Sequence, residues 1–376
     1  MLFFFIYIFW LIRSALQIFF WLYLWQLKQY HTGRFLDHFK TTNGKKLIFH
    51  PFQWGKVVFA LISPYLLLVA YITEPFLRAR RFPSWTKKTI FLALISVLLY
   101  TVLPIFAESI WLLVLADLFL PVCVSLVVLI FQPLSYLFRS SLQKKAGKKR
   151  EELDLKVVAI TGSYAKTSTK EYLSTILSYR FNVSSTKDHQ NTEVAIPRAI
   201  LNLDKSCDIF IAELGAYDKG TIKRICRFLN PQIGIVTGIN EQHLSLFGSM
   251  ENLLSAEGGQ ELLDCLPEDG MLVCNIENGY GADLLQAAKI KKIPYSYADL
   301  KELTVNADKV SFKYDGQEFN CDVLGKHNAL NLLGAIKVAK ELGMSNEEIL
   351  RGIRKIHSST KVIKGKYNII DSSYSA

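Results

Sequence analysis

Residues 162–168 combine the residue types that bind phosphate. They read Gly-Ser-Tyr-Ala-Lys-Thr-Ser and lie between the apolar run 156–161 and a helical pattern over about 167–179. Such a turn presents backbone N–H groups and a helix N-terminus to an anion, while a lysine reaches the β- and γ-oxygens and a hydroxyl binds Mg²⁺. We therefore expect an ATP site with Lys166 on the phosphates and Thr167 on the metal. The remaining members of the loop are Gly162, Ser163, Tyr164, Ala165 and Ser168.

This loop departs from the usual pattern in two ways. The interval from Gly162 to Lys166 is one residue shorter than in G-x-x-x-x-G-K-[ST], and Ala165 precedes the lysine where glycine is usual. If this position has a positive φ, alanine costs on the order of 1 kcal/mol, which weakens the loop without abolishing it. The alternative is a strand-to-helix turn with an incidental lysine.

The elements around the loop alternate between short β-branched runs and helical stretches. We expect strands within 156–161, 208–214, 233–239 and 270–275, and helices within 167–179, 220–228, 251–266 and 281–289. Alternation of this kind predicts a doubly wound, mostly parallel sheet, which binds ligands at the carboxyl ends of its strands. A hairpin that turns at Asp315 and Gly316 follows, and then helices over about 329–342 and 346–356.

The first 150 residues have a different character. They hold 18 of the 44 Lys and Arg residues but four of the 33 Asp and Glu residues, together with long apolar runs. A bilayer span needs roughly 20 apolar residues. The pattern predicts an α-helical membrane region. Its basic flanks account for the net charge of +11, which therefore does not indicate nucleic-acid binding. The candidate spans are 1–26, 57–73, 89–106 and 110–138.

The first run is expected to be a retained span. It begins without basic residues, carries Arg13 in its middle and lacks a small-residue cleavage site, unlike a signal peptide. Basic loops follow the first, second and fourth runs, so the positive-inside bias places the C-terminal part in the cytosol. Four full crossings would leave the first basic loop outside. The alternative is three crossings, with the run 57–73, interrupted by Pro64, entering and returning on one side.

Two features separate the parts of the chain. The segment 143–152 is charged and poor in apolar residues, as expected of a linker, and we assign 1–138 to the membrane region and 139–155 to the linker. The six cysteines are dispersed without C-x-x-C spacing, so neither a zinc site nor a disulfide framework is predicted, and a reduced cytosolic domain fits.

Five segments carry a family resemblance: "GSYAKTSTKEYL", "STKDHQNTEVAIPRAIL", "DIFIAELGAYDKGTI", "PQIGIVTGINEQHLSLFGSMENL" and "GKHNALNLLGAIKVAKELG". In order and spacing they resemble the Mur ligases over roughly residues 156–376, and most of all the branch that adds D-alanyl-D-alanine to a muramyl tripeptide. The resemblance implies a central α/β domain, here 156–360. Such a domain uses ATP and Mg²⁺ to phosphorylate a peptide carboxylate, and an amine then displaces the phosphate.

The resemblance also implies roles for particular residues. Glu213 resembles the carboxylate that binds Mg²⁺, and His243 resembles the histidine near a second metal. Without the resemblance, Glu213 could be a helix cap or an ion-pair residue, and His243 could be a structural histidine. Asn191 and Thr192 match the loop that faces the γ-phosphate and the acyl substrate, although such a loop could also cap the next helix. The resemblance assigns Asn328 and Asn331 to the adenine, where N-capping is the alternative.

Three departures from the family pattern stand out. Many Mur ligases carry a carbamylated lysine after the histidine segment, but no lysine lies between Lys223 and Lys289. Ser255, Glu257 or Glu261 occupy the corresponding region, and a glutamate presents a similar anionic oxygen pair. Membrane spans stand in place of the domain that binds the uridine nucleotide, and residues 361–376 resemble only the entry into the C-terminal domain, as in a truncated ligase.

The expected function is that of an ATP-dependent amide ligase of peptidoglycan precursor synthesis, with Lys166, Glu213 and His243 at the reaction centre. Its substrates would be a muramyl-peptide acceptor, linked to a nucleotide or to a lipid, and D-alanyl-D-alanine or another amino acid. The lipid bilayer would be a further partner, and no nucleic acid is expected. A multi-pass inner-membrane location with a cytoplasmic ATP domain follows. The alternatives are a poly-γ-glutamate or folyl-polyglutamate type ligase and a non-catalytic membrane protein that binds nucleotide.

Overall fold

The computed structural model describes residues 2–28, 30–48, 51–77, 81–102, 109–187, 190–306, 309–356, 361–363 and 369–371. The chain forms two compact units, Met1–Leu137 and Phe138–Ala376.

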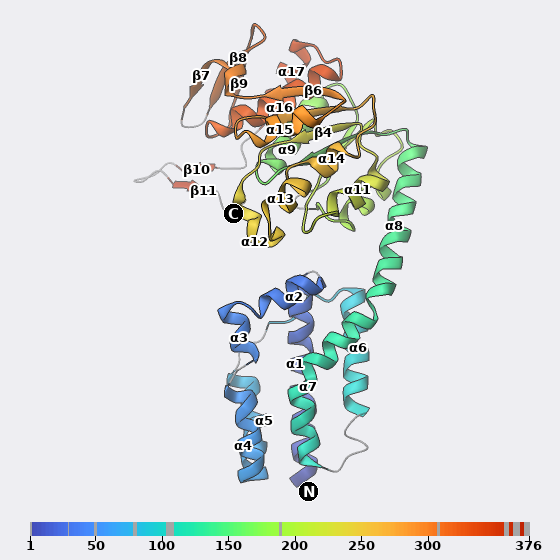
Figure 1. The fold of residues 1–376 in the computed structure, drawn as a ribbon, viewed down its shortest axis with the longest axis vertical. Coiled ribbons are helices and arrows are strands. Elements are labelled where there is room, and N and C mark those ends of the chain that lie inside the picture. The colour runs from blue at the N-terminus through green and yellow to red at the C-terminus, as the bar shows by residue number, and fades with distance from the viewer. Residues whose placement is uncertain are drawn as a thin grey trace. The chain divides into compact units, whose positions relative to one another are not determined.

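Over its described residues, the first unit consists of helices and short connecting segments, without strands. Helix α1 packs against α5, α6 and α7, and α4 packs against α5 and α7, so these long helices run side by side (Figure 1). Their buried faces hold large aliphatic and aromatic side chains, among them Trp10, Trp25 and Tyr71. The helices are α1 (Leu2–Leu27), α2 (Thr32–His38), α3 (Thr42–Ile48), α4 (Pro51–Ile62), α5 (Pro64–Leu77), α6 (Lys87–Val102) and α7 (Ile110–Ile130).

Helices α4 and α5 form a helical hairpin. Lys56 Nζ of α4 lies 3.0 Å from Glu74 Oε2 of α5. In one continuous helix these residues would be about 27 Å apart, at 1.5 Å per residue. The chain therefore reverses at Ser63–Pro64, and the run 57–73 is not one continuous helical span, because Pro64 lacks the N–H that would continue the helix.

The outer surface of the first unit is strongly apolar. Among the described residues, the exposed large apolar side chains lie between Phe4 and Phe138, apart from Tyr164 and Val305. Two helical stretches, Phe4–Leu27 and Ile110–Glu152, are long and apolar enough to cross a membrane. The expected span 89–106 is helical to Val102, and residues 103–108 lie outside the described part.

Four charged side chains meet inside this unit. Arg13 of α1 is fully buried and pairs with Glu74 of α5 and Asp117 of α7, and Lys56 of α4 lies 3.6 Å from Asp117. Gln17 also donates to Glu74, at 3.1 Å. Two cations and two carboxylates compensate each other, which is what permits charges in an apolar interior. The arginine within the first apolar run is thus part of the packing of the unit.

Helix α8 (Gln132–Glu152) includes most of the segment expected to be a linker. In its second half, Ala146 is fully buried in the core of the second unit, and Gly147 lies against Phe228. This segment is therefore a packed helix, although its sequence is charged.

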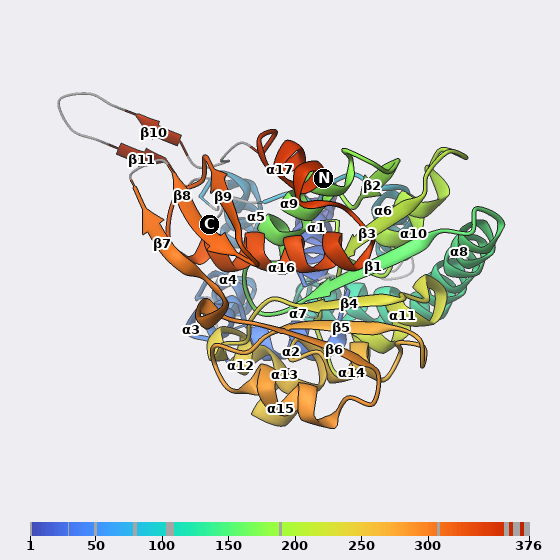
Figure 2. The ribbon, with the colours of Figure 1, turned by 90° about the horizontal axis from the view of Figure 1, so that it is seen from above.

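The second unit contains a six-stranded sheet in which all strand pairs are parallel, which confirms the predicted doubly wound, mostly parallel architecture. The strand order is β2-β3-β1-β4-β5-β6, and Figure 2 shows its central strands β1, β4 and β5 running side by side. The strands are β1 (Lys156–Thr161), β2 (Val183–Ser185), β3 (Ile209–Glu213), β4 (Ile233–Val236), β5 (Met271–Asn275) and β6 (Lys291–Tyr295). The two edge strands were not anticipated, because β2 has three residues and β6 is rich in lysine and contains a proline, which suit an edge.

Helices cover both faces of the sheet. Alternate residues of β1 point to opposite sides: Val157 and Ala159 join one core, and Val158 and Ile160 join the other. The first core is closed by α8, α10 (Ala195–Leu201), α11 (Thr221–Leu229), α13 (Met250–Ala256), α14 (Gln260–Leu263) and α15 (Tyr280–Ala287). The second is closed by α9 (Lys166–Leu177), α16 (His327–Glu341) and α17 (Asn346–Ile353).

One expected helix is divided. The stretch 251–266 forms α13 and α14 instead of one helix, because Gly259 adopts φ 92° and a Cβ there would meet the side chain of Val236. Shorter helical segments are η2 (Glu241–His243), α12 (Leu244–Phe247) and η3 (Tyr297–Asp299).

The predicted hairpin is present in a small antiparallel sheet, β7 (Lys301–Val305), β8 (Val310–Tyr314) and β9 (Gln317–Cys321), with Asp315 and Gly316 at φ 51° and 73°. Two further strands, β10 (Lys361–Ile363) and β11 (Ile369–Asp371), pair with each other. The rest of the expected entry into a C-terminal domain, 364–368 and 372–376, lies outside the described residues.

Candidate active site

The loop 162–168 joins β1 to α9 at the carboxyl edge of the sheet. Gly162 has φ 139°, and a Cβ there would overlap the Thr237 hydroxyl. The N–H of Ser163 donates to the Gly238 carbonyl at 2.7 Å, and the Thr237 hydroxyl donates to the Tyr164 carbonyl at 2.5 Å. The segment after β4 thus fixes the course of the loop, and only glycine fits at position 162.

Ala165 is the N-cap of α9 and has φ 65° and ψ 3°. The position therefore does require the left-handed backbone that disfavours alanine. Its side chain offers no cap to the helix. The first N–H groups of α9 are consequently available to an anion, as at other phosphate-binding helix N-termini.

Lys166 is the first residue of α9, and its ammonium donates to the Gly162 carbonyl. Burial lowers the pKa of Lys166, and the charges of Glu257 and Glu213 act in the opposite direction. A partly buried cation near two carboxylates, beside a helix N-terminus, is suited to bind phosphate oxygens.

Glu213 ends β3 and is buried, 2 % exposed. Its Oε2 accepts from the Thr167 hydroxyl at 3.0 Å and from Lys170 Nζ at 3.2 Å, while Oε1 accepts from Asn191 Nδ2 at 3.2 Å. The structure thus brings three of the predicted residues together, Thr167, Glu213 and Asn191, and adds Lys170.

On the other side of the loop lies a second carboxylate, Glu257. It is 3 % exposed and accepts from the Ser163 hydroxyl at 2.8 Å, and its other oxygen lies 2.8 Å from His243 Nδ1. The other glutamate considered for this region, Glu261, instead accepts from the backbone N–H groups of Gly220 and Lys223 at the start of α11. Glu257 is therefore the carboxylate that faces His243 and the phosphate loop.

The donor sets on both sides of the loop suit Mg²⁺. Hydroxyl and carboxylate oxygens, as offered by Thr167 and Glu213, are the hard ligands this ion prefers. Within the described part of the chain no group of three His, Cys, Asp or Glu side chains could hold a metal ion. That result fits Mg²⁺, which usually takes one or two carboxylates and completes its shell with phosphate oxygens and water.

A cavity of about 340 Å³ adjoins the loop. Its lining comes from the phosphate loop and α9, the end of β5 and the residues after it, η3, and the start of α16: Tyr164, Ala165, Ser168, Asn275, Glu277, Tyr297, His327, Leu330 and Asn331. Asn331 therefore lines the cavity, and its role toward the adenine stays a prediction. Asn328 does not line it; its amide donates to the Leu324 carbonyl at 2.7 Å and its oxygen accepts from Asn331 at 3.0 Å, so that it orients Asn331.

Thr192 has a structural role here. Its hydroxyl accepts from the N–H of Ala195 at 3.1 Å and its carbonyl accepts from the N–H of Ile196, so it supplies acceptors to the first turn of α10, whose N-cap is Val194. This is the capping alternative considered for the loop, whereas the neighbouring Asn191 contacts Glu213.

Sequence reasoning missed several members of this site. Lys170 follows Lys166 by one helical turn and could have been found from the i, i+4 spacing. Asn275, Glu277 and Tyr297 carry no local signal, because they enter the cavity only through the order of the strands.

Comparison with known proteins agrees with this geometry. Residues 160–339 match the family described as Mur ligase middle domain. This chain carries a Mur ligase middle domain. Among curated relatives, the UDP-N-acetylmuramoyl-tripeptide–D-alanyl-D-alanine ligase of Bacillus subtilis (strain 168) is 27% identical over 256 residues, 63% of this chain and 55% of the relative. The enzyme of the same name from Synechocystis sp. is 30% identical over 208 residues, 54% of this chain and 44% of that protein.

Solved structures show the same relationship. A crystal structure of MurF from Acinetobacter baumannii is 26% identical to this chain, with a TM-score of 0.58, and covers 62% of this chain and 54% of its own. MurF ligase from Thermotoga maritima in complex with ADP, at 23% identity and a TM-score of 0.53, shares the fold over 61% of this chain and 55% of that chain. The chain spans about half the length of the curated relatives it matches.

Proposed function

We propose that this Mur ligase domain belongs to an ATP-dependent amide ligase of peptidoglycan precursor synthesis that joins D-alanyl-D-alanine to a muramyl tripeptide. The observation that carries the proposal is the phosphate loop with a buried carboxylate on each side, Glu213 beside Thr167 and Glu257 beside Ser163. The relatives named for this reaction support the choice of substrates.

The reaction has two steps. A carboxylate oxygen of the tripeptide attacks the γ-phosphorus of ATP, the bond to the β-phosphate oxygen breaks, and ADP leaves. The amine of the dipeptide then attacks the acyl carbon, the bond to the phosphate oxygen breaks, and inorganic phosphate and a proton are released. Lys166 and the N-terminus of α9 would hold the phosphates and offset their charge, so that the two anionic reactants can approach.

Mg²⁺ would be held by Thr167 and Glu213, and a second ion by His243 and Glu257. Bound there, such ions supply electrostatic stabilisation to the transferred phosphoryl group. Glu257 is the chemical substitute for the carbamylated lysine of many relatives, because it presents an anionic oxygen pair beside His243. Asn331 and the cavity next to the loop would take the adenine.

We further propose that the first unit is embedded in the cell membrane by three crossings, α1, α6 and α7, with the second unit in the cytosol. Helices α4 and α5, of 12 and 14 residues, measure about 18 and 21 Å at 1.5 Å per residue, less than a bilayer core of about 30 Å, and they form a hairpin. Helix α6 has 16 residues, but its expected span, 89–106, continues past Val102 into residues outside the described part. Entering and returning as a hairpin, α4 and α5 leave the basic loops before α4 and after α5 on the cytosolic side of the membrane, as the positive-inside bias requires.

The test is ADP release by the full natural protein in detergent. Muramyl tripeptide and D-alanyl-D-alanine are supplied together and singly, and Lys166→Ala is the control. The proposal requires release that depends on both substrates and is lost in the control.

The two alternatives give different results in this assay. Release that responds to glutamate and a folate or polyglutamate acceptor would indicate the related polyglutamate ligases. Tight ATP binding without release would leave a non-catalytic membrane protein.

A further inference from the structure

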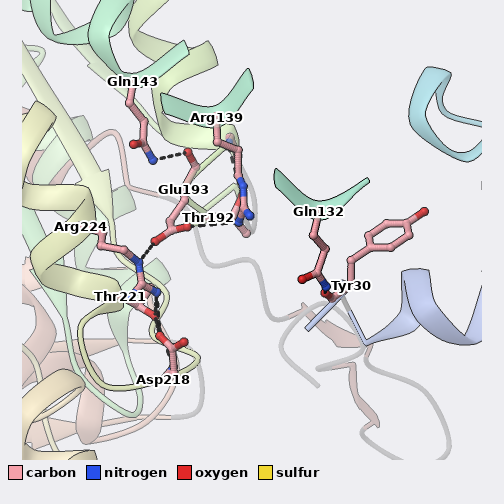
Figure 3. A network of polar contacts seen from close by, with 10 residues as sticks. Tyr30, Gln132, Arg139, Gln143, Thr192, Glu193, Asp218, Thr221 and Arg224 are labelled. Atoms are coloured by element: carbon pink, nitrogen blue, oxygen red, sulfur yellow. Dashed lines mark hydrogen bonds and ion pairs between the residues drawn. The ribbon is translucent and has the colours of Figure 1, made fainter. Parts of the chain in front are cut away.

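The loop that carries Asn191 is held from outside the site. Its last member, Glu193, lies between two guanidinium groups that come from different elements (Figure 3). Arg224 of α11 donates from Nε to one carboxylate oxygen, and Arg139 Nη1 of α8 lies 3.5 Å from the other. The side chain of Glu193 is 17% exposed, so both pairs are partly shielded from water.

Helix α8 holds the same segment at further points. Gln143 Nε2 donates to the Glu193 carbonyl at 3.3 Å, and Lys149 Nζ donates at 2.8 Å to the carbonyls of Leu201 and Leu203, where α10 ends. A lysine at these positions satisfies carbonyls that a helix C-terminus leaves without partners. One face of α8 therefore fixes the segment 193–203 at both ends.

Two residues before Glu193, the backbone enters the site. The Asn191 carbonyl accepts from the N–H of Gly215 at 2.9 Å, and the Asn191 amide contacts Glu213, as described above. Gly215 permits this approach, because a Cβ there would lie 2.7 Å from Asn191 Oδ1. The orientation of Asn191 thus depends on a short stretch of backbone whose far end is anchored by Glu193.

We propose that Glu193, held by Arg139 and Arg224, is a positioning residue that keeps Asn191 on the Mg²⁺ carboxylate Glu213. This assignment rests on the proposed function, because it gives Glu213 its role toward the metal. It makes α8 a support of the active site in addition to its place in the chain between the two units. Groups that orient a metal ligand from behind typically change metal affinity by about 10- to 100-fold when they are lost.

The experiment compares the binding of mant-ADP by the full protein in Mg²⁺ and in EDTA, together with hydrogen exchange of residues 190–196. In Glu193→Gln we expect the affinity in Mg²⁺ relative to that in EDTA to fall about tenfold, the lower end of that range, with the affinity in EDTA unchanged and exchange in 190–196 faster. Arg139→Gln should act in the same direction, and Arg139→Lys, which keeps the charge, should restore most of the ratio.

A matched control is Glu341→Gln, which removes one carboxylate from the ion pair with Lys291 elsewhere in the second unit. It should change neither readout. An unchanged Mg²⁺ ratio or unchanged exchange in folded Glu193→Gln and Arg139→Gln overturns the assignment. A wild-type protein that binds no nucleotide overturns the proposed function as well, and this outcome is seen before any variant is compared.

Discussion

Lys166 combines a required charge with a partly buried position. Burial lowers its pKa, so it loses its proton at a lower pH than an ordinary lysine, whose pKa is about 10.4. Below its pKa the cation holds the phosphates, and as the pH rises through that value the affinity for ADP should fall by about 10- to 100-fold, the loss of a charged hydrogen bond of roughly 1.5–3 kcal/mol. Titration of mant-ADP binding from pH 7 to 10 measures this. Lys166→Arg should remove the alkaline decline, and a decline that persists in that variant would assign it to another group.

Ala165 has a left-handed backbone that costs roughly 1–2 kcal/mol for a non-glycine residue. Ala165→Gly removes that cost, but the greater entropy of the unfolded chain offsets about 0.4–1 kcal/mol of it, so a net stabilisation of up to about 1.6 kcal/mol is expected. Thermal or urea unfolding of the second unit, followed by circular dichroism, measures it. The matched control Ala282→Gly lies within helix α15 and should destabilise by about 1 kcal/mol. If both variants changed the free energy of unfolding in the same direction, the positive φ of Ala165 would not be what destabilises the wild-type loop.

Glu257 and Glu261 allow a comparison between two glutamates on the same stretch of chain. Glu257→Gln removes the charge beside His243 and Ser163, so the Mg²⁺ concentration needed for nucleotide binding should rise by about tenfold or more. Glu261→Gln weakens the cap of α11 and should lower stability by about 1 kcal/mol without changing the Mg²⁺ requirement. Titration of Mg²⁺ at fixed nucleotide, with a melting curve for each variant, separates the two effects. The same Mg²⁺ requirement in both variants would argue against a metal at His243.

At the scale of elements, four helices of the first unit meet through buried charges. Arg13→Met would leave Glu74 and Asp117 against a single lysine, and breaking a buried pair in this way costs roughly 3–5 kcal/mol. The double variant Arg13→Met, Asp117→Asn removes one charge of each sign and should therefore lose less stability than Arg13→Met alone. The fluorescence of tryptophan reports this unit alone, because all six tryptophans of the chain lie within its first 111 residues.

The control for this series is Lys40→Met, which breaks an exposed pair with Asp37. Exposed pairs contribute little, so its melting curve should match the wild type. A double variant as unstable as Arg13→Met alone would show that charge compensation is not what holds these helices.

At the scale of the whole molecule, the three-crossing topology can be tested by cysteine labelling. Ser109→Cys, before α7, should react with a membrane-impermeant maleimide in intact cells, whereas Ser84→Cys, before α6, should react only after permeabilisation. Both serines are exposed, so neither is protected by packing. The wild-type protein with its own six cysteines supplies the background. Labelling of Ser84→Cys in intact cells would contradict the placement of the α4–α5 hairpin.

The sequence by itself determined the features that depend on neighbouring residues. Apolar runs of strand length alternating with helical stretches predict the parallel sheet, and the order glycine, lysine, threonine after β1 predicts the phosphate loop. The turn at Asp315–Gly316 follows from residues that tolerate a positive φ. In each of these, the physical cause acts within a few positions along the chain.

Only the tertiary structure decided which distant residues meet. Lys56 and Glu74 show that one apolar run reverses, Glu257 rather than Glu261 faces His243, and Glu193 anchors the loop of Asn191 through α8. These contacts depend on the order of the strands and on how helices pack, and no local propensity encodes either. The physical reason is that a carboxylate has the same intrinsic chemistry at each of these positions, and its role is set by the partner that the fold brings within hydrogen-bonding distance.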